Sequence, residues 1–245
     1  MKILTYAYNK PEYLAIQNRC LKKFIKEPFD FYCIDNSKED IFTNQLRQIC
    51  QNEQIIYTRN LKPDHTLEGT SHYSALQWSF DTIISNTNEI CVMIDHDNFP
   101  INYISITDFL GDNHVAGCPQ SRDHVEYLNP ALMIFNTENM PNKHSLSFKG
   151  SLIDGKTTDI GGELYFYFRD NPSVKKKHLT MGPILGADPL LSDLAKKYGY
   201  PHTFDLIEGA FVHPRNGSNW SRVPVQEFAN RDKLIFDLLN RNLQK

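Results

Sequence analysis

A run of five apolar residues that ends in an acidic turn is the feature that most constrains the fold of this chain. Ile90–Ile94 is partly β-branched and too short for a buried helix, so it predicts a central strand covered on both faces. The next residues are Asp95, His96 and Asp97. Carboxylates cannot enter a core without partners, so this pair should mark the carboxyl end of the strand. Because side chains alternate along a strand, we expect Asp95 and Asp97 on one side and a structural His96 on the other.

The first hundred residues alternate between predicted strands and helices. Strands are predicted at 3–8, 29–34, 55–58 and 90–94, with an amphipathic helix between each consecutive pair. This order predicts right-handed crossovers and a parallel sheet. Ligands of such sheets bind outside the carboxyl ends of the strands, where Tyr8, Asp35 and the acidic turn should meet. By topology, this half is a nucleotide-binding half.

Residues 101–245 are less regular, and we expect them to belong to the same α/β domain. Further strands are predicted at 115–118, 131–135 and 211–213, and residues 148–158 are predicted as a loop. Pro130 is acceptable only at a strand start or edge. Helices are predicted at 164–168, in preference to an aromatic strand, at 190–198 and at 234–243. The last of these should pack on the domain.

Composition describes an ordinary globular protein that we expect to be soluble. The chain has 245 residues and a net charge of -3, which gives no basis for nucleic-acid binding. No stretch approaches the roughly 20 apolar residues that cross a bilayer, so only peripheral membrane contact is left open. The five cysteines form no C-x-x-C pair, and we expect reduced core thiols in a reducing compartment, the cytoplasm.

Three segments together resemble the nucleotide-binding half of GT-A glycosyltransferases, particularly family 2. They are ILTYAYNK at 3–10, FYCIDNS at 31–37 and MIDHD at 93–97. The resemblance implies a GT-A fold in one domain, 1–245, with a nucleotide-sugar-binding half at 1–100 and an acceptor-side half at 101–245. It implies an inverting, metal-dependent transfer of sugar from a nucleotide-diphosphate sugar, expected to be a UDP-sugar, to the hydroxyl of a glycan or another acceptor.

The resemblance also implies site residues. Asp95 and Asp97 match the D-x-D that holds Mn²⁺ or Mg²⁺, and His213 would be a late histidine ligand. The residues expected at the donor are Thr5, Tyr8, Asn9, Asp35, Arg59, Asp95, Ser218, Asn219 and Trp220. Simpler interpretations stay open: a solvated turn at 95–97, a helix cap at Asp35 in place of a contact with the base, and an ordinary polar histidine at 213.

The segment DIGGE at 159–163 resembles the acidic acceptor-side motif of the family. Asp159 is therefore the candidate general base and Glu163 the reserve, with the two glycines leaving room for an acceptor sugar. The alternative is a helix N-cap at Asp159 with Glu163 as its capping partner. Departures from the family pattern are Ala7 in place of a threonine and the absence of the usual E-D pair.

Two other functions compete with glycosyl transfer. A nucleotidyltransferase would need a glycine-rich basic loop after the first strand, where this chain has only Asn9, Lys10 and Pro11. A non-catalytic carbohydrate- or nucleotide-binding protein with a decayed site would keep its ligand when Asp97 is changed to alanine. Metal-dependent nucleotide binding that is lost in that variant would favour the enzyme.

Overall fold

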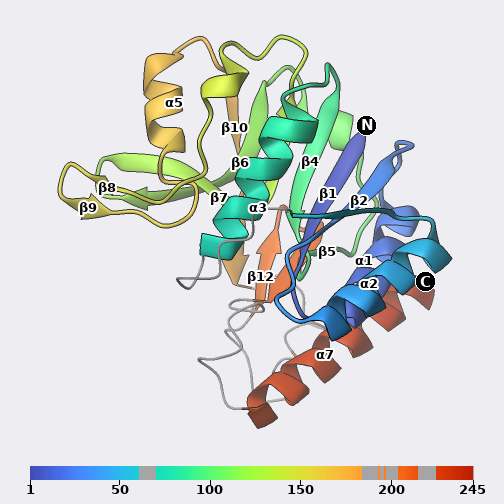
Figure 1. Ribbon diagram of the computed structural model, residues 1–245. Coiled ribbons are helices and arrows are strands. Elements are labelled where there is room, and N and C mark those ends of the chain that lie inside the picture. Colours follow the sequence, from blue (N-terminus) through green and yellow to red (C-terminus); the bar gives the residue numbers. More distant parts are fainter. Residues whose placement is uncertain (61–69, 184–192, 194–195, 197–203, 215–224, 245) are drawn as a thin grey trace.

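The computed structural model describes residues 1–60, 70–183, 193, 196, 204–214 and 225–244 (Figure 1). The first elements are β1 (Lys2–Ala7), α1 (Pro11–Phe24), β2 (Asp30–Asp35), α2 (Asp40–Glu53), β3 (Ile56–Arg59), α3 (Thr70–Ser79), which continues as a π-helix (Phe80–Ile84), and β4 (Ile90–Asp95). Strand and helix alternate as predicted for the first hundred residues. This confirms the α/β class.

The second half is richer in short strands than predicted. Its elements are β5 (Phe99–Pro100), α4 (Ile106–Leu110), β6 (Val115–Arg122), β7 (Val125–Asn136), a 3₁₀ turn (Lys143–Ser145), β8 (Leu152–Ile153), β9 (Lys156–Thr157), α5 (Leu164–Asp170), β10 (Lys176–His178), β11 (Met181–Pro183), β12 (Phe204–Ile207), β13 (Phe211–Pro214) and α7 (Val225–Gln244). The predicted loop at 148–158 holds the β8–β9 hairpin. The helix predicted at 190–198 falls on residues of which only 193 and 196 are described.

The central sheet has seven strands in the order β10-β6-β7-β4-β1-β2-β3. β1 is parallel to β2 and β4, and β2 is parallel to β3. β7 is antiparallel to both β4 and β6, and β10 is parallel to β6, so β7 alone runs against the others. The mostly parallel sheet is thus confirmed. Its consequence is that β1, β2, β3 and β4 end at one edge.

Both faces of the sheet are covered by helices. Ile3 and Ala7 of β1 pack in a buried cluster that contains residues of α1, α2 and α4, whereas Leu4 and Tyr6 pack with α3 and α5. Figure 1 shows α3 lying along the strands at the front of the sheet. A strand enclosed in this way needs apolar residues on both faces, which explains the continuous apolar run Ile90–Ile94 in β4.

A second sheet, in the order β11-β12-β13-β5, joins the end of the chain to the segment after β4. Phe99 of β5 pairs antiparallel with Val212 of β13. The terminal helix α7 packs on this sheet and on α1, with Leu238 and Leu239 buried (Figure 1). This confirms that the predicted amphipathic helix covers the domain.

A buried ion pair fastens α7 to the turn after β1. Lys10 is 5% exposed, and its Nζ lies 2.6 and 2.7 Å from the two carboxylate oxygens of Asp232. The hydroxyl of Tyr13 donates to Asp232 Oδ1 at 2.5 Å. Burial lowers the pKa of Lys10, and the hydrogen bond to Asp232 opposes that shift. One carboxylate on α7 therefore satisfies two buried polar groups of the first helical segment.

The strand predicted at 131–135 begins earlier in the sequence than predicted. Strand β7 begins at Val125, so Pro130 lies in its interior and not at its start. The pairing with β6 is irregular there: Gly117 pairs with Met133, but Cys118 pairs with Asn129. Pro130 falls in the stretch that this bulge leaves out of the β6 ladder, where the missing N–H has no hydrogen bond to lose.

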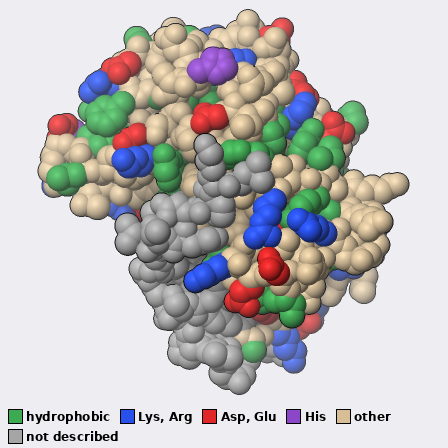
Figure 2. All heavy atoms as spheres, in the orientation of Figure 1, with side chains coloured by type: hydrophobic (Ala, Val, Ile, Leu, Met, Phe, Trp, Pro, Cys, Tyr) green, Lys and Arg blue, Asp and Glu red, His purple; other side chains and the backbone are tan. Residues whose placement is uncertain are grey.

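Several expectations from composition can be compared with the structure. All five cysteines, Cys20, Cys33, Cys50, Cys91 and Cys118, are buried free thiols, as predicted. Among the described residues, no helix is long and apolar enough to span a membrane. On the face shown in Figure 2, basic and acidic side chains are interspersed, consistent with the small net charge.

Candidate functional site

Asp95, Asp97 and His213 meet at the carboxyl edge of the central sheet. One potential ligand atom from each lies within 4.8 Å of those of the other two. His213 Nε2 is 3.6 Å from Asp97 Oδ1 and 4.0 Å from Asp95 Oδ2. The side chain of Asp97 is 3% exposed and those of Asp95 and His213 about 16% and 15% exposed. Two carboxylates and an imidazole from distant parts of the sequence therefore form one compact cluster.

Backbone pairing accounts for this convergence. Strand β4 ends at Asp95, and after the acidic turn the chain enters β5. Because Phe99 pairs with Val212, the next residue of β13, His213, is delivered beside the turn. The buried side chain of Gln17 fixes the turn from α1, since its Nε2 donates to the carbonyl oxygens of Asp95 at 2.8 Å and Asn98 at 2.7 Å.

Asp95 and Asp97 do converge, but the predicted cause, alternation of side chains along a strand, is wrong. Residues 96–97 form a turn and not a continuation of β4, and the N–H of Asn98 donates to the carbonyl of Asp95 at 2.9 Å. It is therefore the turn, not strand alternation, that brings both carboxylates to His213. His96 is 3% exposed and packs beside the ring of Tyr13, with a centroid separation of 5.9 Å. Burial lowers the pKa of His96, which agrees with the expected structural role.

Opposite charges within the cluster outweigh the effect of burial on the pKa values of its side chains. Burial alone would raise the pKa of Asp97, but contact with His213 outweighs it and the pKa falls to about 2. Burial likewise opposes the charged form of His213, yet the carboxylates of Asp97 and Asp95 raise its pKa. Asp97 is thus an anion at neutral pH, and the imidazole beside it is stabilised as a cation. A divalent metal ion would replace that positive charge.

Sequence reasoning missed His72, which lies in the first turn of α3. Its Nε2 is 2.9 Å from Asp95 Oδ1. Burial opposes its charge, but Asp95 prevails and raises the pKa of His72; Asp97 and Asp159 add to this effect. A single histidine after a polar loop carries no periodic signal that could have pointed to this position.

The residues expected around the donor differ in accessibility. Thr5 is fully buried in β1, and its hydroxyl makes no hydrogen bond to a described residue. Tyr8 and Asn9 lie in the turn directly after β1, both partly exposed, and the N–H of Asn9 donates to Ser37 Oγ at 3.2 Å. Tyr8 and Asn9 are therefore at the expected edge, whereas Thr5 has no surface to offer a ligand.

Asp35 has partners that neither interpretation of the sequence predicted. Its side chain is fully buried; Oδ1 accepts from the N–H of Ser37 at 2.8 Å and Oδ2 from the hydroxyl of Tyr57 at 2.7 Å. The helix-cap alternative is wrong, because the N-cap of α2 is Glu39. Arg59, at the end of β3, lies 3.7 Å from Asp35 and donates to Thr43 Oγ1 at 2.5 Å. Contact of Asp35 with a base stays a prediction.

The DIGGE segment forms a turn that precedes α5. The predicted helix is confirmed, but its N-cap is Glu163 and not Asp159, so the expected capping role of Asp159 is wrong. Asp159 is exposed, and its N–H donates to the hydroxyl of Tyr127 at 3.2 Å. Its negative charge also contributes to raising the pKa of His72. Glu163 accepts hydrogen bonds from the hydroxyls of Ser147, at 2.7 Å, and Ser151. Of the two carboxylates in this segment, Asp159 therefore has fewer side-chain hydrogen bonds to the described residues.

The glycines at 161 and 162 serve the turn and do not leave room for an acceptor, contrary to expectation. A Cβ on Gly161 would lie 2.5 Å from the carbonyl oxygen of Leu128, and Gly161 has a φ of +92°. A Cβ on Gly162 would lie 1.9 Å from Thr158 Oγ1. Side chains are excluded at both positions by the protein itself.

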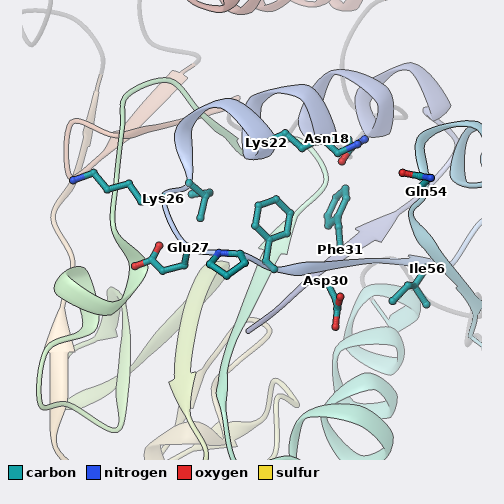
Figure 3. A pocket seen from close by; sticks show the side chains of 11 residues that line it. Asn18, Lys22, Lys26, Glu27, Asp30, Phe31, Gln54 and Ile56 are labelled. Carbon is teal, nitrogen blue, oxygen red and sulfur yellow. The ribbon is translucent and has the colours of Figure 1, made fainter.

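Three of the expected donor residues, Ser218, Asn219 and Trp220, lie outside the described residues. A cavity of about 500 Å³ lies elsewhere, where Phe29, Asp30 and Phe31 meet Lys22, Gln54 and Ile56 (Figure 3). Asp30 and Ile56 begin β2 and β3, so this cavity is at the amino edge of the sheet. It is therefore on the opposite edge from the acidic cluster and is not the predicted nucleotide site.

The donor set of the cluster fits a divalent cation. Two carboxylate oxygens suit hard ions such as Mg²⁺ and Mn²⁺, and an imidazole nitrogen favours Mn²⁺ among these. The distance of 3.6 Å between His213 Nε2 and Asp97 Oδ1 is near the spacing of adjacent ligands around one ion. The fold and site thus describe an α/β protein with a cluster suited to metal binding at the carboxyl edge of its sheet.

Comparison with known proteins gives partial likenesses of structure. No family model and no curated protein sequence matches the chain. A solved structure of the galactosyltransferase LgtC with donor and acceptor sugar analogues matches at 14% identity and a TM-score of 0.40, over 56% of this chain and 58% of that one. The glycosyltransferase GlyE of Streptococcus pneumoniae TIGR4 matches at 13% identity and a TM-score of 0.46, over 73% of this chain and 45% of that one.

The chain spans about half the length of these two structures, at 58% and 45%. Both are glycosyltransferases, the class that the three sequence segments resemble. At these identities and TM-scores the likeness concerns the fold only and says nothing about substrates. What the site does chemically rests on its own residues.

Proposed function

We propose that this protein is a glycosyltransferase that takes its sugar from a nucleotide-diphosphate sugar, expected to be a UDP-sugar, and transfers it to a hydroxyl acceptor. The observation that carries the proposal is the meeting of Asp95, Asp97 and His213 at the carboxyl edge of a mostly parallel sheet. Ligands of such sheets bind at this edge. Tyr8, Asn9 and Arg59 follow β1 or end β3 on the same edge, where a nucleoside can lie beside them.

Asp95, Asp97 and His213 would hold the divalent cation. When bound, the cation supplies Lewis-acid stabilisation of the negative charge that develops on the leaving diphosphate. Asp97 is suited to this role because it stays ionised at neutral pH, with its pKa lowered to about 2. Gln17 supports the cluster by holding the turn through two carbonyl oxygens, so the ligands keep their geometry before any substrate binds.

Asp159 is the proposed general base. Transfer requires removal of the proton from the acceptor hydroxyl, and a single carboxylate in line with the breaking bond gives inversion at the anomeric carbon. Asp159 is exposed and contributes to raising the pKa of His72, whereas both oxygens of Glu163 accept hydrogen bonds from serine hydroxyls. These contacts support Asp159 over Glu163. The anomeric configuration of the product, read by NMR, tests inversion directly.

The test of the function separates the two carboxylate roles. Calorimetry of UDP binding with and without Mn²⁺ should show Mn²⁺-dependent binding that Asp97→Asn abolishes. Asp159→Asn is the matched control, because it should keep Mn²⁺-dependent UDP binding and lose transfer. UDP binding of equal strength without metal, or unchanged in Asp97→Asn, would contradict the proposed site. Donor hydrolysis across a panel of sugar nucleotides then identifies the sugar.

A further inference from the structure

We infer that His72 is a positioning residue that sets which oxygen of Asp95 faces the metal-binding cluster; this rests on the proposed function. His72 Nε2 lies 2.9 Å from Asp95 Oδ1, whereas His213 Nε2 lies 4.0 Å from Asp95 Oδ2. The two oxygens of one carboxylate are thus divided between two histidines on different elements. With Oδ1 occupied on the side of α3, Asp95 offers a single oxygen, Oδ2, to an ion beside His213.

The position of His72 is fixed independently of Asp95. Its ring lies against that of Tyr6, with centroids 5.9 Å apart. Tyr6 belongs to β1, and its hydroxyl is 3.0 Å from Ser79 Oγ, farther along α3. Ala75 and Leu76, in the next turn of α3, are fully buried in the core cluster. Ala75, Leu76 and Ser79 therefore anchor α3, which holds the imidazole of His72 in place. We infer that this imidazole orients the carboxylate of Asp95.

The contact also bears on how the two carboxylates of the turn are kept apart. Asp95 and Asp97 are like charges held on one turn, and each favours an arrangement that separates them. His213 contacts Asp97 more closely than Asp95, at 3.6 Å against 4.0 Å. His72 contacts Asp95 on the outer side through Oδ1, and this contact keeps Oδ2 of the same carboxylate turned toward His213. Partners of this kind behind a ligand typically change metal affinity by 10- to 100-fold.

Substitution at position 72 tests the inference with Mn²⁺ alone as the probe. His72→Phe keeps a ring against Tyr6 but removes the nitrogen, and it should weaken Mn²⁺ binding to the nucleotide-free protein at least tenfold. His72→Gln places an amide nitrogen near the position of Nε2 and should stay within about threefold of wild type, whereas His72→Asn places it near Nδ1 and should behave like His72→Phe. A role limited to folding would not distinguish the two amides.

The controls separate this inference from the function on which it rests. His124→Phe removes a similar pair, His124 with Asp154 at 3.2 Å, on the exposed surface, and should leave Mn²⁺ binding unchanged. Thermal unfolding of each variant confirms that the fold is intact. If wild type binds Mn²⁺ but His72→Phe binds it within threefold, or if His72→Gln fails as His72→Phe does, the positioning role is overturned while the proposed function stands. If wild type binds no Mn²⁺ even with UDP, the metal site itself is wrong and this inference falls with it.

Discussion

The ion pair between Lys10 and Asp232 allows a quantitative test of how α7 is held on the domain. Asp232→Ala removes the carboxylate that lies 2.6 and 2.7 Å from the Lys10 ammonium and 2.5 Å from the Tyr13 hydroxyl. The lysine side chain is 6% exposed, so in the variant a buried charge loses the carboxylate that it contacts most closely among the described residues. Breaking a buried pair costs about 3–5 kcal/mol, and the 26% exposure of Asp232 favours the lower end, about 3 kcal/mol.

Urea and thermal unfolding measure this cost. For a chain of this size, about 3 kcal/mol corresponds to a fall in melting temperature of roughly 6–12 °C. Lys10→Met combined with Asp232→Leu should be less destabilising than Asp232→Ala alone, since no buried charge is left behind. Asp170→Ala is the control: it breaks an ion pair with Arg169 at 2.7 Å in which both side chains are more than half exposed, and it should leave the midpoint unchanged.

The reasoning is refuted if Asp232→Ala lowers the free energy of unfolding by less than about 1 kcal/mol, the value of an exposed pair. It is also refuted if the effects at positions 10 and 232 simply add, because contacting charges should show a coupling energy. Either result would mean that the carboxylate of Asp232 is not what stabilises the buried Lys10 ammonium.

Three further predictions concern a helix cap, a turn and a pH dependence. Glu27 accepts hydrogen bonds from Ser105, Ile106 and Thr107 at the start of α4; burial raises its pKa, but these bonds prevail and lower it to about 2. Because the folded-state pKa is depressed, its stabilisation is present above the unfolded pKa and is lost as pH falls from about 5 through about 2. Glu27→Ala should therefore cost on the order of 1–2 kcal/mol at neutral pH and little near pH 2, measured by denaturation at a series of acidic pH values. Gly161→Ala should lower the free energy of unfolding by about 2 kcal/mol or more in chemical denaturation, because Gly161 has a positive φ and the added Cβ would clash with the Leu128 carbonyl oxygen. Gly155→Ala is the control: Gly155 also has a positive φ, but the added Cβ contacts no other atom, so the change should cost less. Mn²⁺ affinity in calorimetry should fall on acidification below the raised pKa of His213, because a proton competes with the ion, and His213→Gln should show a flatter profile; an unchanged slope would exclude His213 as a ligand.

The first half of the fold could be predicted from the sequence because its strands are buried on both faces. A short run such as Ile90–Ile94 has all of its side chains covered only as a central strand. The parallel order of the strands then places Asp35, Arg59 and Asp95 at one edge of the sheet. The approach of His213 was predicted only through the family resemblance. Its physical cause, the pairing of Phe99 with Val212, involves a two-residue strand that is too short to recognise in a sequence.

Other parts of the site could not be predicted because they depend on tertiary packing. Nothing near His72 in the sequence indicates that it faces Asp95, because this contact depends on how α3 packs on the sheet. In the same way, the hydrogen bond from Gln17 to the turn at Asp95 depends on how α1 packs on the sheet. The glycines at 161 and 162 were explained by an acceptor, but backbone and side-chain atoms of the protein fill that space. Pro130 was placed at a strand start because a bulge inside a long strand leaves no local signal.

The pairing of β5 with β13 has a consequence for the order in which the molecule matures during synthesis. Both aspartates leave the ribosome more than a hundred residues ahead of the histidine that joins them, and the sheet around β4 can form while β13 is still missing. An N-terminal fragment that stops before residue 204 would therefore carry the acidic turn without its nitrogen ligand. Nascent chains of increasing length should acquire high affinity for Mn²⁺ in one step, when β12 and β13 have closed onto Phe99 and Pro100.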